Sequence, residues 1–168
     1  AFSNVVYDEY RSNPQPFIDE LKDLHINDPL GLPIAGEGLP RLKEPGDEDW
    51  YGTTLPWMSI GYEVTQTPLK TLALYNAIAN NGKMIRPLFA SEINEVGKTV
   101  TQFEPEVIED KICSDETLQK LKTLLEDVVK YGTGSDLIPE NYTIAGKTGT
   151  NQIAGREGRG YKSGRVRY

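Results

Sequence analysis

Apolar residues at helical spacing predict two short helices at the start of the chain. The first covers residues 4–11. The second begins with Asn13 as its cap and Pro14 in its first turn, a combination that is common at helix N-termini. Its apolar positions are Phe17, Ile18, Leu21 and Leu24. Because proline disrupts a helix interior, we expect a break at Pro14 rather than one continuous helix.

Residues 28–57 lose this periodicity. Glycine and proline punctuate the stretch at Pro29, Gly31, Pro33, Gly36, Gly38, Pro40, Pro45 and Gly46. A loop of this length inside a compact domain is usually functional or disordered. Trp50, Tyr51 and Trp57 near its end indicate that the loop is held against the rest of the domain.

Two longer helices have clear start and stop signals. Residues 68–81 follow a capping Thr67 and an opening Pro68, and Gly82 ends them. Leu69, Leu72, Ala73 and Ile78 form the apolar face, and we expect Leu72 and Ile78 to be buried. Residues 115–131 begin with Asp115 and Glu116, which complement the helix dipole. The apolar stripe there is Leu118, Leu121, Leu125 and Val128, and we expect Leu121 and Leu125 to be buried.

The remaining segments predict extended structure. Residues 84–103 alternate in character around a turn at 94–98, which predicts a hairpin. Residues 143–150 predict a strand that enters a glycine-containing motif. The pattern is therefore helices first and a small amount of strand last, and the strands are too few to make a full sheet for the two longer helices to cover. This imbalance indicates that part of the domain is absent from the chain.

The composition is that of a globular domain with generous loops. The chain has 168 residues, of which 38% are hydrophobic and 26% charged, with 16 glycines and 11 prolines. No apolar run approaches the roughly 20 residues of a membrane helix, and the first residues lack the pattern of a signal peptide. Any targeting segment has therefore been removed or lies upstream.

The net charge of −7 argues against a nucleic-acid-binding protein, which normally carries a broad basic surface. The charge is uneven, because residues 151–168 carry five basic side chains against the single acid Glu157. The basic residues are Arg156, Arg159, Lys162, Arg165 and Arg167. Two interpretations stay open: a solvated basic hairpin or tail, or a basic wall beside a site for an anionic ligand.

The usual residues of metal and cofactor sites are scarce. Cys113 is the only cysteine and His25 the only histidine, so the chain has no internal disulfide and no Cys/His cluster with zinc-ligand spacing. Phosphate-binding glycine motifs are also absent. We expect no metal, no cofactor and a structural role for His25.

The motif that carries chemistry is Lys147-Thr148-Gly149-Thr150, after the extended run 142–146. Lysine offers a fixed positive charge, and a hydroxyl can bond a substrate carboxylate. Gly149 leaves room for a substrate to lie against a strand. The backbone N–H of Thr150 can point at a developing oxyanion. A K-T-G segment of this kind lines the active site of penicillin-recognising serine enzymes.

Further motifs occur in matching order along the chain. They are Ser59-Ile60-Gly61-Tyr62, Thr67-Pro68-Leu69, Ala77-Ile78-Ala79-Asn80-Asn81-Gly82, Gly132-Thr133-Gly134 and Ala145-Gly146 before Lys147. Together they resemble class B penicillin-binding proteins, and Gly61-Tyr62 resembles the division-type members. The resemblance implies an α+β domain with the transpeptidase fold of the penicillin-binding protein and serine β-lactamase type. This chain would hold the helical subdomain, the K-T-G-T edge strand and a small hairpin.

The resemblance departs from the family at two places. Ser3-Asn4 is similar to the end of the family's S-x-N motif, but Phe2 stands where the first serine belongs, and the pair can equally be a helix cap. None of the serines Ser3, Ser12, Ser59, Ser91, Ser114, Ser135 and Ser163 has a lysine three residues later, as the nucleophile's S-x-x-K motif requires. Residues 1–168 therefore resemble a partial domain without its S-x-x-K region and its C-terminal strands and helix.

The resemblance also implies an activity. The parent would be a peptidoglycan D,D-transpeptidase whose serine attacks D-Ala-D-Ala stem peptides and which β-lactams acylate. Lys147 and Asn4 would be catalytic, and Ser3, Thr148, Gly149 and Thr150 would bind substrate. The parent would be anchored in the cytoplasmic membrane, act outside it, and meet division or cell-wall synthesis proteins. Alternatives are a β-lactamase or D,D-carboxypeptidase on the same fold, or a non-catalytic sensor or scaffold module.

Overall fold

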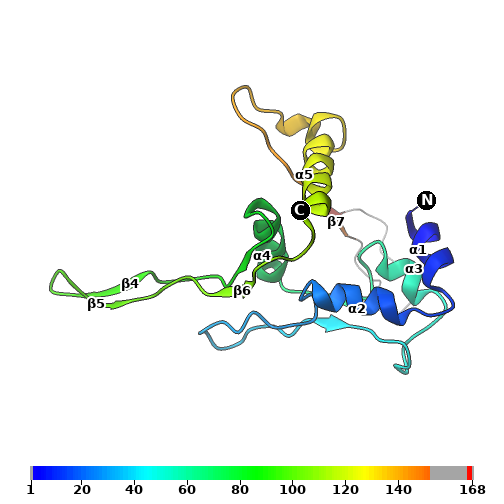
Figure 1. Cartoon of the computed structure of the whole chain (residues 1–168), viewed down its shortest axis with the longest axis horizontal. Coiled ribbons are helices and arrows are strands. Elements are labelled where there is room, and N and C mark those ends of the chain that lie inside the picture. The colour runs from blue at the N-terminus through cyan, green and yellow to red at the C-terminus, as the bar shows by residue number, and fades with distance from the viewer. Residues whose placement is uncertain (1, 152–165, 168) are drawn as a thin grey trace. The chain divides into compact units, whose positions relative to one another are not determined.

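The computed structural model describes residues 2–151 and 166–167, and the chain divides into two compact units (Figure 1). The first unit ends at Ser114 and the second begins at Asp115. Within the described residues, no helix is both long and apolar enough to span a bilayer.

The helices of the first unit follow the predicted order. They are α1 (Phe2–Tyr10), α2 (Gln15–Asp23), α3 (Thr54–Met58) and α4 (Pro68–Ala79). The break between α1 and α2 is confirmed, but the prediction of Asn13 as the cap of α2 is wrong. Pro14 occupies that position without a side-chain cap, and its carbonyl accepts from the N–H groups of Phe17 and Ile18. The Asn13 N–H instead donates to Tyr10, which makes Asn13 part of the turn that leaves α1.

A small core ties α2 to the long loop. Its buried members are Ile18, Leu42 and Met58, and Phe17, Leu21, Trp50 and Val64 pack around them. Leu42 belongs to β1 (Arg41–Leu42), which pairs antiparallel with β2 (Val64–Thr65). Residues 28–57 are therefore held in place by a short strand, a short helix and Trp50, as the aromatic residues indicated.

Helix α4 begins at Pro68 as predicted and ends at Ala79, two residues before the predicted end, and its buried face differs from the predicted one. The Thr67 hydroxyl accepts a 3.1 Å hydrogen bond from the Lys70 N–H, and the Gly82 N–H donates to Ala77 across the C-terminal turn, where Gly82 has φ of +89°. Lys70, Ala73 and Ala77 are buried, whereas Leu72 is 60% exposed and Ile78 is half-buried. The prediction of a buried Leu72 is therefore wrong and that of a buried Ile78 is confirmed only in part, because the buried side of α4 runs through Lys70, Ala73 and Ala77.

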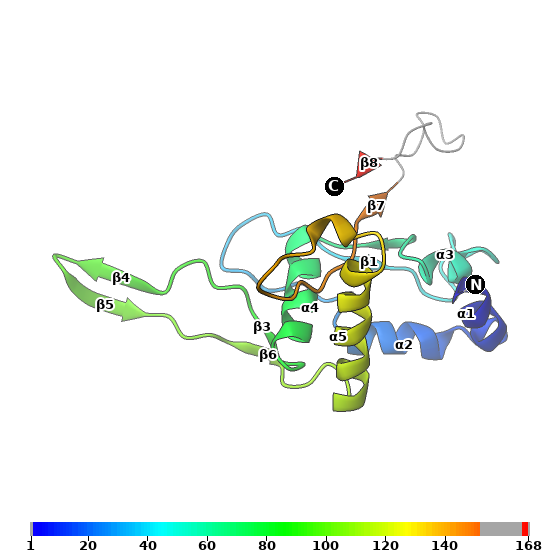
Figure 2. The same cartoon turned by 90° about the horizontal axis from the view of Figure 1, so that it is seen from above.

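The predicted hairpin is present as an isolated ribbon. Strands β4 (Glu92–Glu95) and β5 (Lys98–Gln102) pair antiparallel around a turn at Val96 and Gly97, and they extend away from the helices of their unit (Figures 1 and 2). At the base of the ribbon, β3 (Met84–Ile85) pairs with β6 (Val107–Glu109). Every residue of β4 and β5 is exposed.

The second unit is built on α5 (Asp115–Lys130), which starts with Asp115 and Glu116 as predicted. Leu118 and Val129 are its buried residues, while Leu121 and Leu125 are only half-buried. A short 3₁₀ helix, η1 (Ser135–Leu137), packs beside α5. The helix is therefore confirmed, and the burial of Leu121 and Leu125 is confirmed only in part.

The prediction of a strand over residues 143–150 is largely wrong. Residues 143–149 are neither helical nor part of a ladder, and pairing starts with β7 (Thr150–Asn151), which lies antiparallel to β8 (Val166–Arg167). The Gly146 N–H donates instead to the Leu125 carbonyl of α5. A strand needs a second strand that pairs with it along its length, whereas this segment donates a backbone hydrogen bond to a helix. The basic residues 156–165 lie outside the described residues, so both interpretations of that segment remain untested.

Candidate functional site

The first half of the K-T-G-T motif is a compact polar pair. The Lys147 ammonium donates to the Thr148 carbonyl at 2.9 Å and to the Thr148 hydroxyl at 3.2 Å. Both residues are exposed. A positive charge and a hydroxyl thus share one small surface, which is the combination that binds a carboxylate.

A second threonine completes this group. The hydroxyl oxygens of Thr133 and Thr148 lie 2.9 Å apart, although the residues are 15 positions apart in sequence. Helix α5 holds both segments: its Leu125 carbonyl accepts from the Gly146 N–H and its Val128 carbonyl from the Gly134 N–H, each at 3.0 Å. The end of one helix therefore positions the two hydroxyls.

Two glycines permit this close approach to α5. A Cβ added at Gly132 would lie 2.9 Å from the Val128 carbonyl oxygen, and one at Gly134 would lie 3.2 Å from it. At Gly146 an added Cβ would meet nothing within 4 Å. The glycines on either side of Thr133 therefore have a steric purpose that Gly146 lacks.

The rest of the motif continues into β7. Gly149 is exposed and directly precedes the strand, and Thr150 pairs through its backbone opposite Arg167. Use of the Thr150 N–H as an oxyanion donor stays a prediction.

Ser3 and Asn4 belong to the first unit. Both lie within α1, Ser3 half-buried and Asn4 exposed. Their position inside the helix does not support the alternative that the pair is only a cap. The K-T-G-T motif belongs to the second unit. That Asn4 and Lys147 belong to one site therefore stays a prediction.

A polar cluster in the loop after α2 was not found from the sequence. Glu37 accepts hydrogen bonds from the backbone N–H groups of Leu30 and, at 2.9 Å, Leu32. These bonds, the one from Leu32 first, lower the pKa of Glu37 below its usual value. Arg86 donates to the carbonyls of Leu30 and Gly31 and pairs with Glu106. The backbone of this loop is thereby held by two charged side chains: Glu37 binds its N–H groups and Arg86 binds its carbonyls.

Lys70 lies close to this loop and is only 4% exposed. Its ammonium has no hydrogen-bond partner in the described part of the chain. Burial lowers the pKa of Lys70, and the charges of Asp28 and Glu37 offset that effect only in part. Lys70 therefore carries a poorly solvated positive charge in the first turn of α4.

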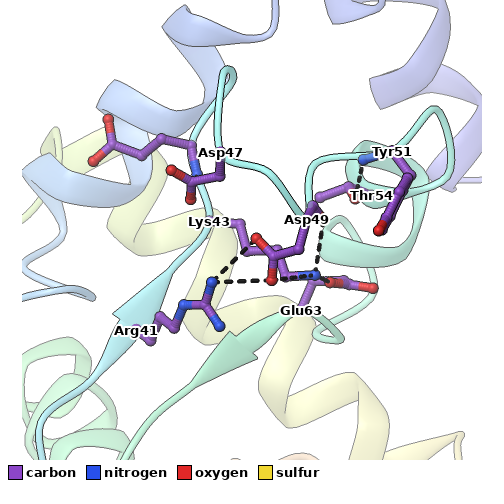
Figure 3. Close-up of polar contacts among 8 residues, drawn as sticks. Arg41, Lys43, Asp47, Asp49, Tyr51, Thr54 and Glu63 are labelled. Atoms are coloured by element: carbon purple, nitrogen blue, oxygen red, sulfur yellow. Dashed lines mark hydrogen bonds and ion pairs between the residues drawn. The ribbon is translucent and has the colours of Figure 1, made fainter. Parts of the chain in front are cut away.

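A second charged network surrounds Lys43 (Figure 3). Lys43 lies between Asp49 and Glu63, and the Arg41 guanidinium donates to both carboxylate oxygens of Asp49. The hydrogen bond with Glu63 raises the pKa of Lys43. Each charge here has an opposite partner, so we assign the network to holding the loop between β1 and β2 rather than to a ligand.

Metal-binding geometry is not found in the described ranges, where no three His, Cys, Asp or Glu side chains gather as ligands. His25 contacts Asp28 through Nδ1 at 2.8 Å and Glu109 through Nε2 at 3.6 Å. These contacts link the end of α2 to β6 and fit the predicted structural role.

Comparison with known proteins identifies the family. Residues 10–167 match the family model of the penicillin binding protein transpeptidase domain. Stage V sporulation protein D of Bacillus subtilis is 31% identical over 136 residues, which cover 79% of this chain and 20% of that protein. Penicillin-binding protein PbpB of Mycolicibacterium smegmatis is 31% identical over 150 residues, covering 84% of this chain and 22% of that protein.

Solved structures agree with these relatives. Penicillin-binding protein 3 from Mycobacterium tuberculosis, in complex with ampicillin, matches with a TM-score of 0.74 and 28% identity over 92% of this chain and 35% of that chain. The helices and paired strands described above therefore belong to the α+β class of those transpeptidase domains. The chain itself belongs to the penicillin-binding protein transpeptidase domain family. It spans about a fifth of the length of the curated relatives that it matches.

The resemblance to division-type class B penicillin-binding proteins is thus confirmed at the level of the family. Thr133 is the residue near the motif that sequence reasoning did not assign. The signal was present, because Thr133 lies between two glycines in the G-T-G motif. Its contact with Thr148 depends on the turn after α5, which the sequence pattern does not specify.

Proposed function

We propose that this chain is part of a peptidoglycan D,D-transpeptidase that cross-links stem peptides through a serine acyl-enzyme. The observation that carries the proposal is the exposed Lys147–Thr148 pair inside a chain whose residues 10–167 match the transpeptidase domain. The serine would lie in an S-x-x-K motif of the parent protein. It would attack the D-Ala-D-Ala peptide bond, release D-Ala and transfer the acyl group to an amine of a second stem peptide.

The motif residues have distinct roles in this proposal. Lys147 supplies positive charge next to the nucleophile and the substrate carboxylate, and Thr148 and Thr150 bind that carboxylate. Gly149 leaves space for the substrate backbone, and the Thr150 N–H is one oxyanion donor. Asn4 takes part in catalysis and Ser3 in substrate binding, and both are residues of α1. No step requires a metal or a cofactor.

The same site accepts β-lactams, because their carboxylate and strained amide present the same groups to the serine. The parent is anchored in the cytoplasmic membrane and acts on its outer side, where peptidoglycan lies. Its partners are stem peptides, β-lactams and other proteins of cell-wall synthesis or division. The sequence feature that supports the division-type assignment is the run Gly61-Tyr62 before Thr67-Pro68-Leu69.

The test is labelling of the intact parent protein with a fluorescent penicillin. We expect one stable covalent band on a denaturing gel, mapped to a serine of an S-x-x-K motif upstream of Ser3. An acyl-enzyme that hydrolyses within seconds would indicate a β-lactamase instead. Absence of any labelled band in a folded parent would support a non-catalytic module and would contradict the proposal.

A further inference from the structure

The hydroxyl of Thr148 contacts two polar side chains, those of Lys147 and Thr133. A threonine hydroxyl has one proton to donate and two lone pairs to accept. The Lys147 ammonium donates into one lone pair at 3.2 Å, and the Thr133 hydroxyl lies 2.9 Å away. The direction of the Thr133–Thr148 hydrogen bond therefore decides where the Thr148 proton points.

Only one of the two directions suits an anionic ligand. If Thr148 donates to Thr133, the Thr148 proton is already engaged in a hydrogen bond within the protein and is not available to a ligand. If Thr133 donates to Thr148, both lone pairs of Thr148 are filled and its proton is free for an incoming acceptor. A carboxylate only accepts hydrogen bonds, so its arrival selects the second direction.

We infer that Thr133 is a positioning residue for Thr148: its hydroxyl donates to the Thr148 oxygen and turns the Thr148 proton toward the substrate carboxylate. The inference rests on the proposed transpeptidase function and adds a residue to it. The backbone supports this role, because the Gly134 and Gly146 N–H groups both bind carbonyls of α5. Helix α5 thereby holds Thr133 and Thr148 opposite each other.

The test uses the intact parent protein and the variant Thr133→Val, which replaces the hydroxyl by a methyl group. The measured quantities are the dissociation constant and the acylation rate constant for benzylpenicillin and for its methyl ester. For benzylpenicillin we expect dissociation to weaken about two- to tenfold, the range of one neutral hydrogen bond, with a smaller change in acylation rate. The ester lacks the anionic acceptor, so its constants should change little.

Matched variants separate positioning from folding. Thr133→Ser keeps the hydroxyl and should restore binding, and Thr123→Val makes the same replacement on the exposed surface of α5 and should have no effect. In a Thr148→Val background, Thr133→Val should cause no further loss. Melting temperatures of all variants verify that they are folded.

Two outcomes would overturn the inference alone. One is a reactive parent in which Thr133→Val binds benzylpenicillin normally. The other is an equal loss for the free acid and the ester, which would indicate a general disturbance of the segment. A folded parent that never forms an acyl-enzyme would instead overturn the proposed function, and this inference with it.

Discussion

The carboxylate of Glu37 accepts a 2.9 Å hydrogen bond from the backbone N–H of Leu32. A second bond, from Leu30, closes the loop between these residues around one carboxylate. An ionised carboxylate accepts hydrogen bonds more strongly than a protonated one, so both bonds weaken when Glu37 is protonated. The stability of the loop over residues 30–37 should therefore depend on pH.

Glu37→Gln should destabilise the chain at neutral pH and have less effect in acid. The folded state lowers the pKa of Glu37 below its usual value of 4.5. Its stabilising contribution is thus complete above that value and is lost as the pH falls through the folded pKa. Urea unfolding from pH 7 to pH 3 measures this, with the exposed Glu104→Gln as control. A variant whose loss of stability is the same at every pH would contradict the assignment.

Lys70→Met should stabilise the fold. A buried polar group without a partner costs about 1–3 kcal/mol, and methionine has a similar length without the charge. Because burial lowers the pKa of Lys70, the unsubstituted chain should gain stability as the pH rises toward 10.5, and the variant should lose this alkaline gain. Thermal melts between pH 7 and pH 10 test both points. The exposed Lys98→Met is the control, and a lower melting temperature for Lys70→Met would show that its ammonium is paired.

Gly132→Ala should destabilise the second unit, and Gly146→Ala should be tolerated. The new methyl group at position 132 meets the Val128 carbonyl at 2.9 Å, whereas the one at position 146 has open space. Forced contacts of this kind cost about 1–3 kcal/mol. Denaturant unfolding of both variants provides the comparison. Equal stability of the two would mean that the turn after α5 adjusts without cost.

This chain alone should form no acyl-enzyme with a fluorescent penicillin, because none of its serines belongs to an S-x-x-K motif. The measurement is a denaturing gel after incubation, with the intact parent protein as positive control. A covalent label that maps to any serine of residues 1–168 would show that the nucleophile has been misplaced.

In the intact parent, Lys147→Ala should slow penicillin acylation more than Thr150→Ala does. The first change removes the positive charge that the proposal places beside the substrate carboxylate, while the second keeps the backbone N–H and loses only a hydroxyl contact. Loss of one oxyanion donor typically costs about 10²–10³ in rate, and Thr150→Ala retains that donor. Second-order acylation rates and thermal melts are the measurements, and the melting temperatures should stay close to the parent's. Normal acylation by Lys147→Ala would make this lysine an ordinary solvated residue.

Local signals in the sequence were sufficient for the start and the stop of α4, but not for the cap of α2, where Pro14 takes the place predicted for Asn13. Thr67 and Pro68 start α4 and Gly82 stops it, because capping depends on residues within one turn. The buried face of α4 could not be predicted in the same way. Leu72 and Ala73 both belong to the apolar stripe, and only the packing of neighbouring elements decides which of them is covered.

The candidate site shows the same division. Lys147 and Thr148 are adjacent in sequence, so their contact could be anticipated from the motif. The approach of Thr133 to Thr148 depends on a turn that brings together residues 15 positions apart. The predicted strand before the motif failed for a related reason: extended residues become a strand only when another strand pairs with them, and here Gly146 binds α5.

The β4–β5 ribbon has no core beneath it, and this has a consequence for its backbone amides. The hydrogen bonds of the ribbon can open without disturbing Ile18, Leu42 or Met58, so the ribbon should exchange its amide protons for deuterium far sooner than α2 does. The register shift between Ile93 and Asn94 and the charges of Glu92, Glu95 and Lys98 also make its edges poor templates for another strand.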